Sequence, residues 1–122
     1  MYITQIKKKK KKYVYIASPY SDGDALVNVK RQIDCAEVIM RYSERFNIYP
    51  YVPLMSHFHH ELYPHTYEFW MDQDFAWLEK CDFVIRLDGE SGGADREVKR
   101  AGELLIPVYY SLKDLFSALR IE

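Results

Sequence analysis

Four short apolar runs divide the chain, and the segments between them are long enough to form helices. The runs are YVYIAS at 13–18, NIYPYVP at 47–53, DFVIRL at 82–87 and IPVYY at 106–110. The first and third lack polar alternation, which is typical of strands buried on both faces. Pro50 favours an edge or irregular position for the second. Strands that alternate with helices predict an α/β fold with a parallel sheet and right-handed crossovers.

Helices are predicted at 24–46, 66–80, 94–105 and 112–120, whereas residues 54–65 have no clear period and are predicted to form a loop. Residues placed to cap helix N-termini are Asp22 or Asp24, Thr66, and Ser111 with Asp114 three residues on. In the first helix the residues at helical spacing are Leu26, Val29, Ile33, Ala36, Ile39 and Met40. In the second, one side carries Phe69, Trp70, Gln73, Ala76, Trp77 and Lys80.

The charge is divided unevenly between a basic N-terminal arm, residues 1–12, and a single acidic domain, residues 13–122. Six of the 17 Lys and Arg residues form the run Lys7–Lys12, and all 18 Asp and Glu residues follow it, so the domain carries a net charge of −7. This balance argues against nucleic-acid binding by the domain. The run precedes the first strand, opposite the expected ligand site, so removing residues 1–12 should leave any turnover nearly unchanged.

The composition favours a cytoplasmic protein. No apolar run approaches the roughly 20 residues of a membrane helix, and the start of the chain lacks the order of a secretory signal. The two cysteines, Cys35 and Cys81, are far apart in sequence and are expected to be buried free thiols.

Parallel sheets bind ligands beyond the carboxyl ends of their strands, which directs attention to segments 18–24, 54–65 and 88–97. The first contains Ser18 and Tyr20 before a helix N-terminus, a position suited to an anion, although an ordinary capped turn explains it equally well. In the third, the sequence SGGADRE places Ser91 and two glycines before a helix whose first turn holds Glu97. We expect the helix end to stabilise the charged form of Glu97, as a nucleophile requires, unless that residue only improves capping.

Asp74 is the second carboxylate of interest, because two carboxylates in one pocket can cleave a glycosidic bond. Asp72 competes with it, but helical geometry turns the two about 200° apart. Asp74 borders Trp70 and Trp77 and is therefore the preferred residue.

All four histidines, together with Glu61, lie in or next to the segment 54–65. The histidines are His57, His59, His60 and His65. Their spacing matches no common zinc motif, and Pro64 interrupts any helical face before His65. A loop that contacts a base or lies on the surface is favoured over a metal site, and no cofactor is predicted.

Taken together, three segments resemble the nucleoside 2-deoxyribosyltransferase-like superfamily, nearest the branch of 2'-deoxynucleoside 5'-phosphate N-hydrolases and cytidylate N-glycosidases. The first is the ASPY turn at 17–20. The second is QDFAWL at 73–78 with CDFVI at 81–85. The third is Ser91-x-Gly93-x-x-x-Glu97 with Ala101, followed by IPV at 106–108.

The resemblance implies a small flavodoxin-like or Rossmann-like three-layer sandwich with a parallel sheet of four to five strands, a homodimer, and cleavage without a metal. It implies Glu97 as the nucleophile and Asp74 as the group that assists the leaving base or positions the sugar. The substrate-binding residues are then Ser18, Tyr20, Arg31, Trp70, Ser91 and Gly93. Ser91 would meet a 5'-phosphate, with Gly93 letting the chain approach, although the first loop lacks the glycines and the arginine of the hydrolases.

Arg96 is expected either to pair with Asp95 or to reach that phosphate, and Tyr20, Phe58, Phe69 and Trp70 are expected to stack on the base. We expect hydrolysis of a (deoxy)nucleoside 5'-monophosphate to free base and sugar phosphate through a glycosyl-Glu97 intermediate. The alternatives are a nucleoside 2-deoxyribosyltransferase and a nucleotide-binding module without catalysis.

Overall fold

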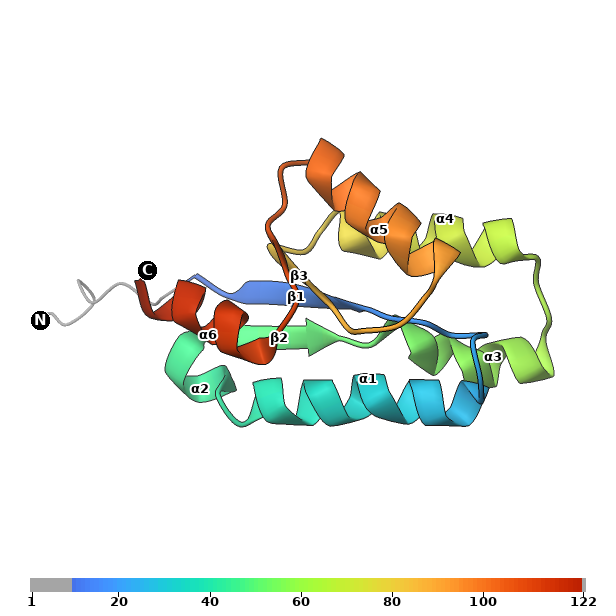
Figure 1. The fold of residues 1–122 in the computed structure, drawn as a ribbon, viewed down its shortest axis with the longest axis horizontal. Coiled ribbons are helices and arrows are strands. Elements are labelled where there is room, and N and C mark those ends of the chain that lie inside the picture. Colours follow the sequence, from blue (N-terminus) through green and yellow to red (C-terminus); the bar gives the residue numbers. More distant parts are fainter. Residues whose placement is uncertain (1–9, 122) are drawn as a thin grey trace, which may run out of the picture.

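The computed structural model describes residues 10–121, which form a parallel sheet with helices on both faces (Figure 1). The strands are β1 (Lys12–Ala17), β2 (Ile48–Tyr51), β3 (Phe83–Arg86) and β4 (Val108–Tyr109), in the order β2-β1-β3-β4. All three pairings are parallel. The expected α/β sandwich with a four-stranded parallel sheet is confirmed, and β2, which contains Pro50, lies at an edge as its proline predicts.

The helices are α1 (Ala25–Met40), α2 (Ser43–Phe46), α3 (Ser56–Leu62), α4 (Tyr67–Leu78), α5 (Gly92–Glu103) and α6 (Leu112–Ile121), with a 3₁₀ turn, η2, at Pro53–Met55. Three expected caps are confirmed, since Asp24, Thr66 and Ser111 each accept hydrogen bonds from backbone N–H groups of the following turn. None of the helices formed by residues 10–121 combines the length and the hydropathy that a bilayer-spanning helix requires.

Alternate residues of β1 face two separate cores. Val14 and Ile16 pack with α1, α2 and α6 on one face. Tyr15 and Ala17 pack with α4 and α5 on the other (Figure 1). Tyr15 therefore points toward the two helices that carry Asp74 and Glu97.

The first helix ends earlier than predicted and buries a different face. It stops at Met40, and the chain turns through Tyr42 into α2, where Tyr42 and Phe46 pack on Phe116. Leu26, Ile33 and Met40 are exposed, contrary to the apolar pattern. The buried stripe instead includes the polar residues Asn28 and Gln32, whose side chains donate hydrogen bonds to the end of β1 and the loop after it. A search for apolar spacing passes over such residues.

Three further expectations need correction. Residues 54–65 contain most of η2 and all of α3 rather than only a loop; α3 has no buried residue and therefore shows no apolar period. The buried residues of α4 are Met71 and Leu78, while Phe69 and Trp77 are exposed. The helix α5 begins at Gly92, two residues earlier than predicted, because Ser91 is its cap.

Residues 1–9 of the basic arm lie outside the described residues. Lys10 and Lys11 are exposed, and Lys12 begins β1 at the end of the sheet opposite Ser18. Both cysteines are free, with Cys35 buried as expected and Cys81 only half-buried.

Candidate active site

A pocket of about 420 Å³ opens beyond the carboxyl end of β1, between the loops that follow β1 and β3 and the helices α3 and α4. Its acidic and histidine lining residues are Asp22, His57, His60, His65, Asp74, Glu90 and Glu97. No lysine or arginine is among the described residues that line it. The pocket therefore brings four carboxyl groups and three histidines together without a lysine or arginine.

Glu97 lies at the buried side of this pocket. Its side chain is only 5% exposed, and the hydroxyl group of Tyr15 donates a short hydrogen bond to Oε2. Burial raises the pKa of Glu97 to about 8, and nearby Asp74 adds to the rise, while the Tyr15 hydrogen bond and Arg86 oppose it. The expected stabilisation of the charged form by the helix end is wrong, because α5 begins at Gly92 and Glu97 falls in the second turn, beyond the main reach of the dipole.

Asp74 approaches the same region from α4. It lies between Met71 and Leu78, the two buried residues of that helix, and it lines the pocket, whereas Asp72 is exposed and does not. Burial raises the pKa of Asp74 to about 7. Both Glu97 and Asp74 raise the pKa of Tyr15 further above its ordinary value, after the larger effect of burial, so the three groups act on one another electrostatically.

The loop after β1 brings Ser18 and Tyr20 to the pocket. The Oγ atom of Ser18 accepts a hydrogen bond of 2.8 Å from Nε2 of Gln32, which also donates to the carbonyl of Ile16 at 2.9 Å. The hydroxyl of Tyr20 lies 2.6 Å from Nδ1 of His57. Gln32 lines the pocket as well and was not identified from the sequence, because a glutamine within a predicted apolar face carries no chemical signal.

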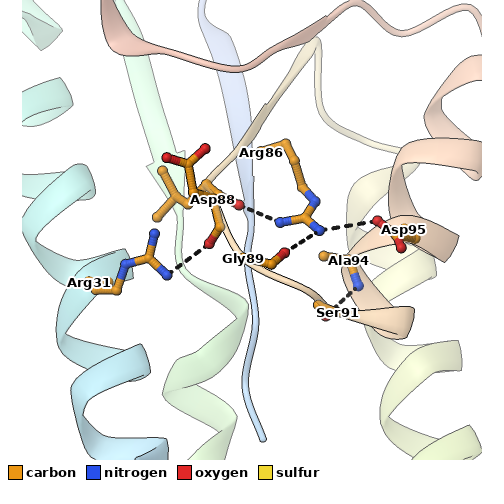
Figure 2. A network of polar contacts seen from close by, with 8 residues as sticks. Arg31, Arg86, Asp88, Gly89, Ser91, Ala94 and Asp95 are labelled. Atoms are coloured by element: carbon orange, nitrogen blue, oxygen red, sulfur yellow. Dashed lines mark hydrogen bonds and ion pairs between the residues drawn. The ribbon is translucent and has the colours of Figure 1, made fainter. Parts of the chain in front are cut away.

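The loop between β3 and α5 is held by two arginines, as Figure 2 shows. The guanidinium of Arg86 donates to the carbonyls of Leu87 and Gly89, the latter at 2.9 Å, and pairs with Asp95 at 3.1 Å. Arg31 donates to the carbonyl of Asp88 at 3.0 Å and does not line the pocket, contrary to its predicted role in substrate binding.

Ser91 and Gly93 line the pocket, although their contacts differ from those expected. The Oγ atom of Ser91 accepts a hydrogen bond of 3.0 Å from the N–H of Ala94 as the cap of α5 (Figure 2). A Cβ atom at Gly93 would lie 3.4 Å from the Tyr67 hydroxyl and 3.5 Å from the Met71 sulfur, so this glycine lets α5 approach α4. Arg96 pairs with Glu68 at 2.8 Å rather than with Asp95.

Of the aromatic residues expected to stack on a base, Tyr20 and Trp70 line the pocket, and Phe58 and Phe69 do not. His57, His60 and His65 also line it, and Nδ1 of His60 lies 2.8 Å from Nε1 of Trp70. Within residues 10–121, no three His, Cys, Asp or Glu side chains are grouped so that they could hold a metal ion.

Residues 12–111 match the family described as "Domain of unknown function (DUF7768)", and the chain belongs to this family. No curated protein matches the chain. Among solved structures it is similar to the 2-deoxyribosyltransferase of the psychrotolerant bacterium Bacillus psychrosaccharolyticus, with 15% sequence identity and a TM-score of 0.48. That similarity covers 79% of this chain and 69% of the other.

Proposed function

We propose that the protein cleaves the N-glycosidic bond of a nucleoside-type substrate and releases the free base. The observation that carries this proposal is the pair of buried carboxyl groups, Glu97 and Asp74, whose pKa values are both raised within one pocket. Carboxyl groups perturbed in this way are typical of sites that transfer protons or attack carbon. The Tyr15 hydroxyl orients the carboxyl group of Glu97 through its hydrogen bond to Oε2.

In the first step, a carboxylate oxygen of Glu97 attacks the anomeric carbon of the sugar. The bond between that carbon and the base nitrogen breaks, and its electron pair passes to the base. Asp74, which is protonated at this stage, gives its proton to the site on the base where negative charge develops. The result is a glycosyl ester of Glu97, a neutral base and an ionised Asp74.

The charge around the two carboxyl groups determines which of them is ionised and attacks the sugar, and which is protonated and assists the base. Their raised pKa values, about 7 and about 8, allow each group to be protonated or ionised near neutral pH. In the free protein, burial places the higher pKa on Glu97. Positive charge that develops at the anomeric carbon favours the ionised form of the adjacent Glu97, and the Tyr15 hydrogen bond acts in the same direction.

In the second step, water attacks the anomeric carbon, and Asp74 takes up a proton from that water. The ester bond breaks and Glu97 leaves as a carboxylate, so the enzyme returns to its starting state. A second base in place of water would produce a new nucleoside, which is the transferase alternative. The same residues serve both reactions.

The charge of the pocket bears on the form of the substrate. With no lysine or arginine in the described lining, and with Arg31 and Arg96 engaged elsewhere, a 5'-phosphate would find no permanently charged cation there. The pocket therefore favours an uncharged nucleoside over the 5'-monophosphate that the sequence suggested.

The homodimer implied by the resemblance is part of this proposal. Apolar side chains on α3 and on the first turn of α1 are exposed, among them Leu26, Val27, Phe58 and Leu62. Helix α3 and the first turn of α1 lie at the same end of the molecule (Figure 1). Such a surface suits contact with a second copy.

The proposal is tested by incubating the protein with a panel of nucleosides and their 5'-monophosphates and measuring the free base released. We expect Glu97→Gln to lower the rate by about 1,000-fold or more, and Asp74→Asn by roughly 100-fold to 10,000-fold. Asp72→Asn, two residues away on the exposed side of α4, is the matched control and should retain wild-type turnover.

Full activity in Glu97→Gln would overturn the mechanism. Adding a second base separates the two reactions, because a transferase forms a new nucleoside faster than it releases sugar. Thermal stabilisation of the wild-type protein by nucleosides, with no base released from any of them, would instead indicate a binding module without catalysis.

A further inference from the structure

The ring of His60 is held in one orientation at the wall of the pocket. Its Nδ1 atom lies 2.8 Å from the indole nitrogen of Trp70 and 3.2 Å from the backbone nitrogen of His65. Both of these nitrogens carry a hydrogen and can only donate, so Nδ1 of His60 accepts from both. An accepting Nδ1 carries no proton.

This arrangement determines which tautomer His60 adopts. A neutral imidazole has one N–H group and one acceptor nitrogen, so with Nδ1 as the acceptor the proton resides on Nε2. No hydrogen bond or ion pair among the described residues uses the Nε2 atom of His60. His60 lines the pocket, and this N–H group is the ring donor that remains for a ligand there.

Trp70, which orients the ring of His60, is itself packed against other aromatic rings. Phe69 and His65 stack with ring centroids 3.9 Å apart, and each meets the Trp70 ring edge-on, at 5.2 and 5.5 Å. Trp70 is also only half-exposed and lines the pocket. The donor is therefore held in place before any ligand arrives, which lowers the entropy lost on binding.

The position of His60 relative to the carboxyl groups follows from helix geometry. Trp70 and Asp74 are four residues apart on α4 and both line the pocket, which places them just over one turn, or about 6 Å, apart along the helix. A planar base whose glycosidic bond lies at Asp74 and Glu97 extends over a similar distance. Its far edge then reaches the region of Trp70 and His60.

We propose that His60 is the residue that recognises the base, donating through Nε2–H to an acceptor on the base edge, and that Trp70 positions it in the donating tautomer. This inference rests on the proposed function for the identity of the ligand. It specifies the substrate class as nucleosides whose base carries an unprotonated ring nitrogen on the edge away from the sugar. Bases in which that acceptor is replaced by C–H are poor ligands.

The first test examines the tautomer and needs no activity. In a ¹⁵N-labelled wild-type protein near neutral pH, the ring nitrogens of His60 are identified by their loss in His60→Gln. We expect a protonated Nε2 and an unprotonated Nδ1, and we expect Trp70→Phe to weaken this preference because it removes the indole donor. A proton on Nδ1 in the wild-type protein overturns the inference.

The second test compares calorimetric binding of nucleosides with that of deaza analogues in which single ring nitrogens are replaced by C–H. We expect the wild-type protein to bind at least one nucleoside about tenfold more tightly than its analogue. His60→Gln keeps an N–H donor near the position of Nε2 and should keep the preference, whereas His60→Asn should lose it. Asp72→Asn is the control, because Asp72 is exposed and does not line the pocket, and its preference should match that of wild type.

The outcomes separate this inference from the proposed function. A preference that depends on His60, with no base released, supports base recognition and contradicts catalysis. Release of base with equal affinity for every analogue supports catalysis and overturns the role of His60. The comparison of analogues on the wild-type protein remains decisive if His60→Asn does not fold.

Discussion

The chemistry of the site depends on how three side chains are buried together. A glutamate near a helix N-terminus ordinarily has a lowered pKa, but Glu97 lies in the second turn and is almost fully enclosed, so desolvation outweighs the helix. The Tyr15 hydroxyl is the donor that keeps a buried Glu97 satisfied. Tyr15 gave no sign of this role in sequence, since an aromatic residue in a buried strand is ordinary core.

The raised pKa values predict how stability depends on pH. From ordinary values of 4.5 and 3.8, the pKa values of Glu97 and Asp74 rise to about 8 and about 7 in the folded protein. The folded state therefore binds more protons than the unfolded state between about pH 4 and 8, and stability present at pH 4 is lost as the pH rises through this window.

We expect Glu97→Gln and Asp74→Asn each to be more stable than wild type at pH 8, by at least about 1 kcal/mol, and to lose this advantage at pH 4. Urea denaturation at the two pH values measures the difference. Asp72→Asn is the control and should follow the wild-type curve. A wild-type stability that increased from pH 4 to pH 8 relative to these variants would contradict the raised pKa values of the two carboxyl groups.

At the scale of elements, the pocket depends on loops that other elements hold in place. The loop after β3 is tied by Arg86 and by Arg31 from α1 (Figure 2), and its Gly89 lies against Pro19 of the loop after β1. Arg86 is thus part of the support for the pocket, although its place in a predicted buried strand gave no reason to select it. Arginine rather than an apolar residue stands there because three polar groups need its donors.

Gly89 gives a direct test of that support. Its φ of +117° disfavours any side chain, and a Cβ atom there would lie 2.7 Å from Cγ of Pro19. We expect Gly89→Ala to lower the free energy of unfolding by about 1–3 kcal/mol and to reduce turnover as the loop shifts.

The matched control is Gly102→Ala in α5. A Cβ atom there meets nothing within 4 Å, so this change should stabilise the protein by roughly 0.5–1 kcal/mol through helix propensity. Equal stabilities of Gly89→Ala and wild type in urea denaturation would show that the loop does not need this close approach. The double variant Pro19→Ala Gly89→Ala should recover only part of the loss, because the backbone strain remains.

At the scale of the whole molecule, the acidic domain and the acidic pocket act in the same direction on a charged substrate. The net charge of −7 after the lysine run and the carboxylates around the pocket oppose the approach of a phosphate. Lys10 and Lys11 lie beside the start of β1, at the opposite end of the sheet, and cannot offset this locally.

Ionic strength therefore separates the two forms of substrate. Between about 0.01 M and 0.3 M salt, we expect kcat/KM for a 5'-monophosphate to rise at least about threefold relative to that of its nucleoside, because screening weakens the repulsion. The uncharged nucleoside is the internal control. A ratio that falls with salt would indicate that basic groups hold the phosphate.

The sequence by itself determined the sheet and the starts of α1, α4 and α6, because each strand is an apolar run and each confirmed cap bonds to N–H groups of the turn that directly follows it. It also identified Asp74, Glu97 and the loops that line the pocket, since these follow from spacing and from the geometry of parallel sheets. Only the tertiary structure decided the raised pKa values of the carboxyl groups and the contacts of Tyr15 and His60. It also decided that Arg31 and Arg96 bind other residues and do not line the pocket. These depend on burial and on partners distant in sequence, such as Tyr15 and Glu97, and no local pattern records such pairs.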